Sequence, residues 1–521
     1  MRIDYDEGLG LFLWSGPFEQ RDAPEEAGFR WNSQIKRWST ADLYTAYRLA
    51  VGARVTPAAV ERLRPVRDNL ARSAAAEDPP DLAPIPAPPG RRYRAYQRAG
   101  IRGLADRPAA LLADEQGLGK TIQVVGLANL LGLSRILVVC PASLRLNWAR
   151  EITAWHLHSL SCAALLSGRD EVPAEDPVVV SYDLVTGAFY DALVSQRWEM
   201  IVVDEAHYIK NSDAARTQML LGLGQHTPLV NQAERRLFLT GTPVPNRPTE
   251  FFALLKTQAP GLIGNVGFWR FARRYAYVVG NGPGRQIKGA RNQEDLRTRL
   301  RGSGFMVRRL KQDVLRELPP KQHKLVLFPA DQKTRRVLKK ESDFSAAEII
   351  EHGEPVGSAL PEIRREMGEA LAPSAVAYVR DLLEEVEKVV VFAHHVSVVE
   401  RLSAGLAEYG CVEIVGKTPG KKRQANVDAF QSDPEVRVLV GHLISAGTGW
   451  TLTASSDVVF AEASWVPGEN DQAVDRTHRI GQANSVTAHF LVVEGSISAA
   501  VLSSALRKKE DCKPITDEVT R

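Results

Sequence analysis

The sequence contains few cysteines, and none are paired at metal-binding or redox spacing. Its 521 residues include four cysteines that lie far apart, namely Cys140, Cys162, Cys411 and Cys512. A zinc ribbon needs closely spaced Cys-x-x-Cys pairs, and a disulfide framework needs cysteines at regular, closer intervals. The sequence therefore predicts neither zinc nor disulfides, and a reducing cytoplasm is the expected location.

Long apolar runs and a strong charge bias are also absent. No run approaches the ~20 residues that span a bilayer, and the start, MRIDYDEGLG, lacks the features of a signal peptide. We therefore expect neither membrane insertion nor export. The net charge of +4, from 66 basic and 62 acidic residues, does not by itself identify a nucleic-acid binder. Any basic groove must come from local placement of side chains.

The chain is longer than one hydrophobic core usually serves, and its pattern divides it into four parts. We expect a small α+β module at 1–75, a Pro/Ala-rich linker at 76–90, and two lobes at 91–315 and 316–521. Both lobes contain short apolar, often β-branched runs between longer helical stretches, which is typical of strands buried in parallel sheets. The predicted fold class is α/β, with two tandem doubly wound parallel-sheet lobes.

The segment LLADEQGLGKTIQ, Leu111 to Gln123, contains a Gly-Lys-Thr that is typical of nucleotide phosphate binding. It departs from the strict phosphate-loop pattern, because Asp114 stands where that pattern has its first glycine. The apolar run before it and the amphipathic stretch after it predict the strand, turn and helix that such a loop requires. The expected roles are backbone amides facing phosphates at Gly117 and Gly119, terminal-phosphate binding by Lys120, and a hydroxyl for Mg2+ from Thr121.

A second segment, MIVVDEAH, contains two acidic residues and supports the same interpretation. Its apolar strand ends in two carboxylates at the edge of the sheet where open α/β folds bind ligands. Asp204 is expected to hold Mg2+ through water, and Glu205 to orient or deprotonate the attacking water. Upstream, Gln97 in YRAYQRAG is the candidate for reading adenine. ATP and Mg2+ are therefore the expected ligands.

The segment DQAVDRTHRIGQ in the second lobe places Arg476 and Arg479 three residues apart, hence on one face of an expected helix. Two permanently charged guanidinium groups suit triphosphate oxygens, and an arginine finger contributes roughly 10³ to 10⁵ in rate. We expect a composite site, with the arginines meeting the nucleotide held by the first lobe. Closure of the lobes would then drive a motor that alternately changes its spacing along a polymer.

Ten motifs, in order, resemble those of the Swi/Snf family of superfamily II helicase-like ATPases. They are YQRAG, DEQGLGKTIQ, VVCPASLRLNW, VVVSYDL, VDEAHYIKN, LTGTPVPN, FMVRRLKQDVLRELPPK, VVVFAHH, ISAGTGWTLTAS and WVPGENDQAVDRTHRIGQ. The resemblance covers nearly everything from Arg91 to about Ser504, and is greatest to the annealing-helicase (HARP) branch, whose members track along double-stranded DNA. It implies two RecA-like lobes with ATP in their cleft. The Ala/Arg-rich composition suggests a bacterial or phage genome.

The resemblance also implies roles for individual residues. Thr240 and Thr242 should couple the nucleotide to DNA, and Gln472 should lie near the nucleotide. Contacts to double-stranded or branched DNA are expected, mostly through phosphates, from Ser143, Tyr182, Asn246, Thr448 and Trp465. The expected function is DNA-dependent ATP hydrolysis with translocation on duplex DNA, remodelling or reannealing forks, with little strand separation.

Several alternatives stay open. The motor could displace DNA-bound proteins such as RNA polymerase, the chain could be a DNA-binding scaffold with a silent ATPase site, or it could be a small-molecule kinase. The intact basic and acidic site residues argue against the scaffold, and the second lobe argues against the kinase. In the first module, Phe29, Trp31 and Trp38 form either a small core or a platform for unpaired bases, helped by nearby basic residues Arg30, Lys36 and Arg37.

Overall fold

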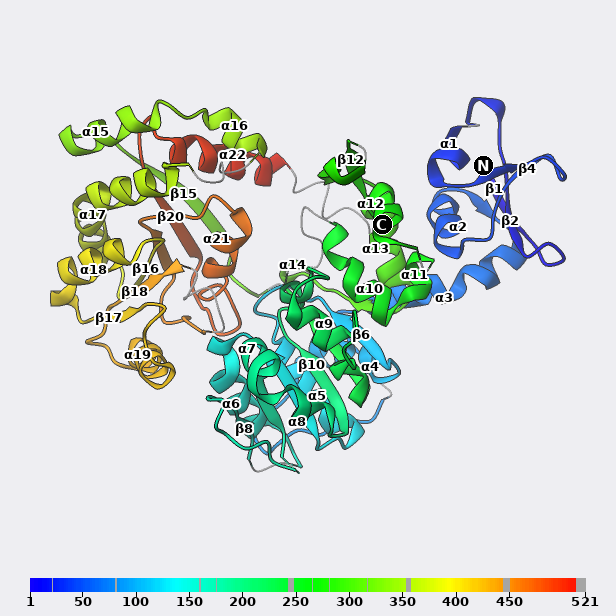
Figure 1. Cartoon of the computed structure of the whole chain (residues 1–521), viewed down its shortest axis with the longest axis horizontal. Coiled ribbons are helices and arrows are strands. Elements are labelled where there is room, and N and C mark those ends of the chain that lie inside the picture. The colour runs from blue at the N-terminus through cyan, green and yellow to red at the C-terminus, as the bar shows by residue number, and fades with distance from the viewer. Residues whose placement is uncertain are drawn as a thin grey trace. The chain divides into compact units, whose positions relative to one another are not determined.

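The computed structural model divides into two compact units, Met1–Val314 and Leu315–Arg521 (Figure 1). It describes all residues except 21, 80–81, 159–160, 175, 242–247, 265, 281, 316, 353–357, 444–449 and 512–521. The division falls inside the FMVRRLKQDVLRELPPK segment. In the described part of the chain, no helix combines the length and the apolarity that a membrane span requires.

The first unit begins with a five-stranded sheet of order β3-β4-β2-β1-β5. Its strands are β1 (Arg2–Asp6), β2 (Leu11–Ser15), β3 (Arg30–Asn32), β4 (Arg37–Thr40) and β5 (Arg54–Val55), accompanied by helices α1 (Asp22–Ala27), α2 (Leu43–Ala50) and α3 (Pro57–Ala74). Phe29 is buried in this small core, as the core interpretation predicts. Trp31, in contrast, is 55% exposed, because β3 is an edge strand whose side chains face solvent. The core interpretation of Trp31 was therefore wrong.

The main sheet of the first unit has seven parallel strands in the order β14-β6-β11-β10-β7-β9-β8. They are β6 (Ala109–Leu112), β7 (Ile136–Cys140), β8 (Ala163–Ala164), β9 (Val178–Ser181), β10 (Trp198–Val203), β11 (Ala233–Leu239) and β14 (Met306–Val307). Alternate residues enter two separate cores: Leu111 and Val139 pack on one face, Leu112 and Val138 on the other. Helices α4 (Ala95–Ala105), α5 (Lys120–Leu131) and α6 (Arg145–Trp155) contribute to the second core. Both faces of the sheet are buried, as the apolar runs predict.

The second unit contains a six-stranded, entirely parallel sheet of order β15-β20-β19-β16-β18-β17. Its strands are β15 (Lys321–Phe328), β16 (Val389–Ala393), β17 (Cys411–Ile414), β18 (Val438–His442), β19 (Asp457–Phe460) and β20 (Val486–Val493). The helices that matter below are α17 (Leu360–Glu385), α19 (Gly420–Ser432), α21 (Pro467–Val474) and α22 (Ile497–Asp511). The prediction of two doubly wound α/β lobes with a small N-terminal module is confirmed.

Ion pairs connect the N-terminal module to α13 (Gln293–Gly302), near the end of the first unit. Arg299 of α13 forms ion pairs with Asp42 at 2.6 Å and with Asp295 at 2.9 Å, and Arg48 of α2 reaches Asp295 at 3.4 Å. Arg299 and Asp295 are both almost fully buried. Because breaking one side of a buried pair leaves an uncompensated charge, this network opposes separation of module and lobe.

Candidate functional site

The predicted phosphate loop connects β6 to α5, as a phosphate site requires. Gly117 and Gly119 have φ angles of 88° and 75°, in the left-handed region that glycine tolerates best. Gly119 precedes α5, and no side chain in the described residues caps the helix. Its first backbone amides are therefore suited to phosphate oxygens. Lys120 Nζ donates to the carbonyl of Asp114 at 2.9 Å, so its amine lies on the loop.

Asp114, the residue that departs from the phosphate-loop pattern, is fully buried and pairs with Arg309. Its Oδ1 accepts from the Arg309 backbone amide and from Nε, both at 3.0 Å, while Arg309 Nη2 donates to Oδ2. Gln123 Nε2 adds a fourth hydrogen bond at 2.9 Å. Arg309 is itself 2% exposed and also donates to the carbonyl of Tyr96. Asp114 therefore braces the loop against the last residues of the first unit.

Glu115 extends this brace by one residue. Its Oε2 accepts from the backbone amide of Lys311 at 2.8 Å, and its own amide donates to the carbonyl of Arg309 at 3.1 Å. One step earlier, the amide of Ala113 donates to the carbonyl of Val307 at 2.8 Å. The chain leading into the loop thus runs hydrogen-bonded beside residues 307–311. The sequence interpretation missed this pairing, although Arg308-Arg309 directly after an apolar strand was an available signal.

The acidic strand end lies at the same edge of the seven-stranded sheet, after β10. Asp204 is 8% exposed and accepts from Trp148 Nε1 at 2.8 Å and from the amide of Glu205 at 2.9 Å. Burial raises the pKa of Asp204 to about 6, helped by the charge of Glu205 and opposed by the hydrogen bond from Trp148 and by the charge of Lys120. A cation beside this buried carboxylate would favour its charged form.

Glu205 adopts a strained backbone conformation for a residue with a side chain. Its φ of 51° lies in the left-handed region, and its carbonyl accepts from the amide of Tyr208 at 2.9 Å. Such a conformation costs about 1–3 kcal/mol and persists where the surroundings hold it. The Glu205 carboxylate is 3.4 Å from His207 Nδ1.

Together these residues fit a magnesium nucleotide. The loop supplies amides and an amine, Thr121 supplies a half-buried hydroxyl at the second position of α5, and Asp204 supplies a buried carboxylate. Hydroxyl and carboxylate oxygens are the donors that Mg2+ prefers. The chemistry of this donor set therefore matches the predicted ligands.

Two further predicted residues of the first unit lie against the loop. Gln97 is buried, accepts from the amide of Arg94 at 2.9 Å and donates to the carbonyl of Leu118 at 3.3 Å. A Cβ added at Gly119 would lie 2.6 Å from Gln97 Nε2, so the amide group contacts the loop directly. Thr240 is 2% exposed at the end of β11, and its amide donates to the carbonyl of Leu112 at 3.1 Å.

The predicted DNA-contacting residues differ in how far their side chains are exposed. Ser143 is half-buried in the short turn after β7. Tyr182 is 3% exposed, its hydroxyl donates to the carbonyl of Asp204 at 2.6 Å, and its ring stacks on Tyr208. Its hydroxyl is thus already bonded within the protein. Thr242, Asn246 and Thr448 lie outside the described residues.

The second unit corrects one expectation about the arginine pair. Arg476 and Arg479 do not lie on one face of a helix, because α21 ends at Val474. The carbonyl of Arg476 accepts from the amide of Leu452 at 2.8 Å, so it is not available to continue the helix. Arg479 Nη1 donates to the carbonyl of Trp450 and to Thr451 Oγ1, both at 2.9 Å. The turn, not a helix, positions the two guanidinium groups.

Two further predicted residues of this unit, Trp465 and Gln472, precede Arg476 in the sequence. Gln472 is half-buried on α21. Trp465 is also half-buried, with its Nε1 bonded to Ser498 Oγ at 3.1 Å and the guanidinium of Arg364 4.1 Å from its ring centre. Trp465 is therefore partly packed and partly exposed, and its role at the duplex stays a prediction.

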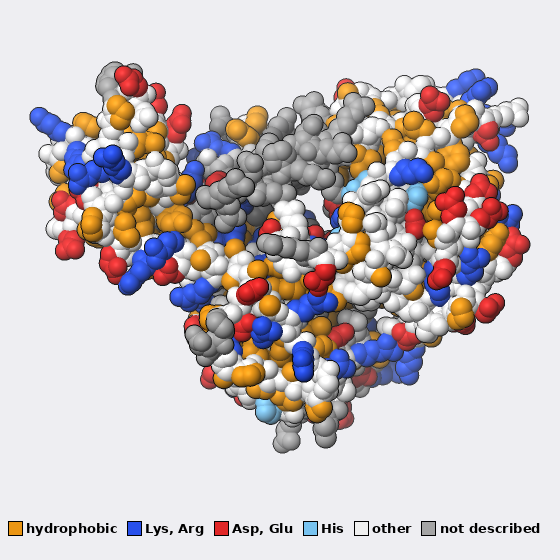
Figure 2. Space-filling model, turned by 180° about the vertical axis from the view of Figure 1, so that it is seen from behind, with side chains coloured by type: hydrophobic (Ala, Val, Ile, Leu, Met, Phe, Trp, Pro, Cys, Tyr) orange, Lys and Arg blue, Asp and Glu red, His pale blue; other side chains and the backbone are white. Residues whose placement is uncertain are grey.

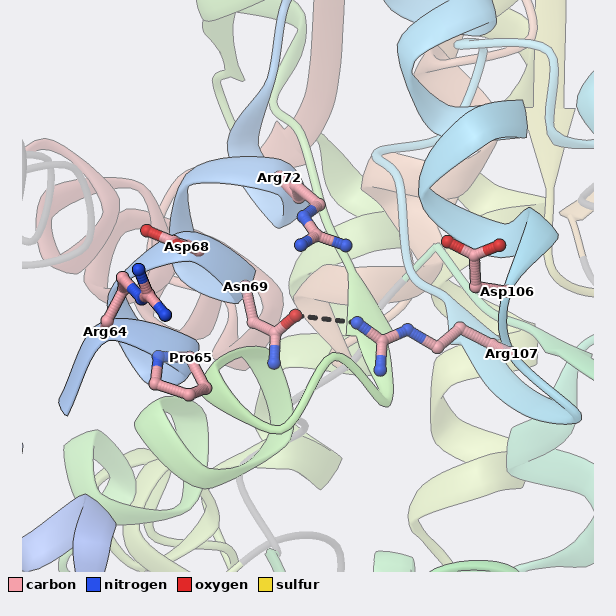
Figure 3. Close-up of a pocket in the computed structure, with 7 residues that line it drawn as sticks. All are labelled: Arg64, Pro65, Asp68, Asn69, Arg72, Asp106 and Arg107. Atoms are coloured by element: carbon pink, nitrogen blue, oxygen red, sulfur yellow. Dashed lines mark hydrogen bonds between the residues drawn. The ribbon is translucent and has the colours of Figure 1, made fainter. Parts of the chain in front are cut away.

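A cavity of about 450 Å³ lies between α3 and the turn after α4, and none of the predicted site residues lines it. Figure 3 shows the guanidinium groups of Arg72 and Arg107 near Asn69, whose Oδ1 accepts from Arg107 at 2.6 Å. Asp68 and Asp106 also line the cavity, so its charges are mixed. On the face in Figure 2, lysine and arginine side chains are likewise interspersed with acidic ones.

The family follows from a match along the chain. Residues 26–361 match the model of the SNF2-related domain, and residues 374–481 match that of the helicase conserved C-terminal domain. The chain belongs to the SNF2 family. The predicted Swi/Snf membership is confirmed, and this SNF2 protein is a helicase-like ATPase by family.

Two groups of curated relatives are also similar in sequence to the chain. The chain is 34% identical over 438 residues to the mouse DNA annealing helicase and endonuclease ZRANB3, covering 80% of this chain and 40% of the relative. It is 33% identical over 427 residues to the Xenopus tropicalis SWI/SNF-related matrix-associated actin-dependent regulator of chromatin subfamily A-like protein 1, covering 80% and 44%. The SNF2 chain thus spans about two-fifths of the length of these relatives.

One solved structure also matches the chain, at a low level of similarity. The Sulfolobus solfataricus SWI2/SNF2 ATPase core in complex with dsDNA is 22% identical, with 84% of this chain and 94% of that chain covered at a TM-score of 0.40. The likeness to annealing helicases therefore comes from the curated relatives.

Proposed function

We propose that this SNF2 protein is a DNA-dependent ATPase that translocates on double-stranded DNA and remodels or reanneals branched DNA. The observation that supports this most is the position of Lys120, Asp204 and Glu205 at one edge of the seven-stranded sheet, in a chain similar to DNA annealing helicases. A scaffold with a silent site would have no need to keep a buried, destabilising carboxylate at Asp204.

In this proposal each residue of the first unit has one task. Lys120 and the loop amides bind the ATP phosphates, and Gln97, already against the loop, contacts the nucleotide base. Thr121 and Asp204 would hold Mg2+, which when bound neutralises phosphate charge. Glu205 accepts a proton from the attacking water, and its left-handed backbone conformation follows directly after β10.

The second unit would contribute positive charge in the transition state. We propose that Arg476 and Arg479 act as arginine fingers and that Gln472 assists nucleotide binding, so hydrolysis needs both units. An arginine finger contributes roughly 10³ to 10⁵ in rate. Replacing Arg476 by Ala should therefore lower kcat strongly while the first unit still binds nucleotide.

Coupling and DNA contact complete the proposal. Thr240 and Thr242 would transmit the nucleotide state toward DNA, which is contacted through Ser143, the segment around Tyr182, Asn246, Thr448 and Trp465. These contacts go to phosphates and give little sequence preference. The exposed Trp31 beside Trp38, with ring centres 5.9 Å apart, supports a base-stacking platform on the N-terminal module. Trp31→Ala should weaken fork binding more than duplex binding.

The deciding experiment measures ATP turnover without nucleic acid and with single-stranded, double-stranded and forked DNA, using Lys120→Ala as the inactive control. We expect stimulation by double-stranded and forked DNA that disappears in the variant. An absence of stimulation by any DNA would refute the motor proposal.

A second candidate within the same class is a translocase that displaces DNA-bound proteins. A fork-reannealing assay run beside the displacement of a stalled RNA polymerase separates the two. Reannealing without displacement supports the leading proposal, and the opposite result supports the alternative.

A further inference from the structure

The first unit carries a long stretch of chain that has basic residues and no acidic ones. Between Glu250 and Glu294 the sequence contains seven lysines and arginines and no aspartate or glutamate. The chain as a whole is nearly balanced, with 66 basic and 62 acidic residues. Six of the seven lie between Arg270 and Arg291, on or beside α12 (Phe268–Tyr275) and the hairpin of β12 (Ala276–Val279) and β13 (Gln286–Ala290). It was not part of the predicted site.

Helix α12 turns its apolar side inward and its charged side outward. Phe271, Ala272 and Tyr275 are buried, whereas Arg270 and Arg273 are exposed. Arg274, one residue on, is held at 3.0 Å by the buried Asp295. Like charges three and four residues apart repel on a helix surface, and α12 itself contains no acid to offset them. An anionic partner would relieve this repulsion.

The hairpin adds exposed aromatic surface to the same region. Tyr277 is 57% exposed and Val279 52% exposed, two residues apart and hence on one face of β12. Trp269 of α12 is 37% exposed. In Figure 1, β12 lies away from the seven-stranded sheet, with α10 (Phe252–Gln258), α12 and α13 between them. The hairpin therefore does not cover the main core.

Guanidinium groups accompany two of these rings. Arg285 lies 5.1 Å from the ring centre of Trp269, and Arg291 lies 5.8 Å from that of Tyr277. Arg270, Arg273, Arg285 and Arg291 form no ion pair with any residue that the structure describes. Exposed rings interleaved with unpaired arginines are the combination that binds single-stranded nucleic acid, because bases stack on rings while phosphates meet the cations.

We propose that α12 and the β12–β13 hairpin bind an unpaired strand of branched DNA. The inference rests on the proposed function, for which it supplies a reason to prefer forks over plain duplex. Phosphates of the strand meet Arg270 and Arg273, and a base stacks on Tyr277. A duplex would not need the exposed aromatic side chains, since its bases already stack on each other.

The test compares binding of the full chain to three fluorescent probes, namely a fork with unpaired arms, a single strand and a blunt duplex, over a range of salt concentrations. Arg270→Gln/Arg273→Gln should weaken fork and single-strand binding and lower the salt slope by about 1.4, at about 0.7 per phosphate contact. Tyr277→Ala should weaken both about tenfold without changing the slope. Melting temperatures establish that the variants fold.

A matched control removes the same charge elsewhere. Arg64→Gln/Arg67→Gln on α3 replaces exposed arginines that already pair with Glu61 and Asp68, at 2.7 and 3.0 Å. We expect this control to bind all probes like the wild type. Unchanged fork binding in the α12 variants, or an equal loss on the blunt duplex, would overturn the inference. Wild-type protein whose ATPase ignores DNA would instead refute the proposed function, whatever the binding results.

Discussion

Restoring the glycine of the strict phosphate-loop pattern is expected to damage this site. Asp114→Gly removes the carboxylate that accepts hydrogen bonds from the Arg309 main chain and guanidinium and from Gln123. Arg309, at 2% exposure, would then be a buried cation whose acidic partner is gone. Removing one partner of a buried pair costs about 3–5 kcal/mol, a large part of the ~5–15 kcal/mol that stabilises a domain.

The nucleotide affinity should fall with the brace. Because Asp114 fixes the segment on which Lys120 Nζ rests, loss of the carboxylate frees the loop to adopt conformations that do not bind phosphate. If the loop is disordered in nine molecules of ten, the apparent Kd for ATP rises about tenfold. The assay is equilibrium binding of a fluorescent ATP analogue, with denaturant unfolding of the same samples.

A double-mutant cycle and a matched control make the reasoning refutable. Arg309→Met alone should also destabilise, but Asp114→Gly/Arg309→Met should lose less than the sum, because no buried charge remains unpaired. Arg299→Met breaks another buried pair, with Asp295, away from the loop. It should cost similar stability without changing ATP affinity. Zero coupling in the cycle, or equal loss of ATP binding in the Arg299 variant, would refute the brace.

Three further results are expected from the structure. Glu205→Gln should bind ATP but lower kcat by about 10² to 10⁴, as loss of a general base does, in single-turnover measurements. Folded Asp204 holds its proton to about pH 6 against 3.8 for the free group, so wild-type stability falls through this residue as pH rises between these values. The Asp204→Asn side chain does not titrate. The unfolding free energy of this variant minus that of the wild type should therefore rise by about 2–3 kcal/mol as the pH is raised from 4 to 7.5. A difference that stays constant over this pH range would contradict the burial argument. At Gly100 a Cβ would clash with the side chains of Gln123 and Arg309, so Gly100→Ala should raise the KM for ATP in steady-state assays, although alanine favours helix formation.

The parallel sheets and the nucleotide loop were predictable because their signals are local. Apolar runs such as RILVVCP identify strands by length and β-branching, and the run before Gly117 to Thr121 identifies a strand, turn and helix. The same is true of the acids after β10. In each case the residues that define the feature lie within about fifteen positions of each other.

The remaining features depend on distant contacts. Arg309 lies 195 positions from Asp114, so no periodicity connects them. α21 ends at Val474, and the carbonyl of Arg476 in the following turn accepts from the amide of the distant Leu452. Trp31 is exposed because β3 is an edge strand, which only the strand order reveals. Helix and strand propensities carry none of this information.

The acidic pair of the loop makes the phosphate site mechanically continuous with the end of the first unit. A glycine at position 114 would leave the loop held by main-chain bonds alone, whereas Asp114 and Glu115 add side-chain bonds to Arg309 and Lys311. These two residues lie within five positions of Val314, where the first unit ends. Any displacement of the loop between nucleotide states must therefore displace residues 309–311 or break a buried ion pair that is costly to break. The acid at position 114 therefore stiffens the loop, which a glycine at the same position would not do.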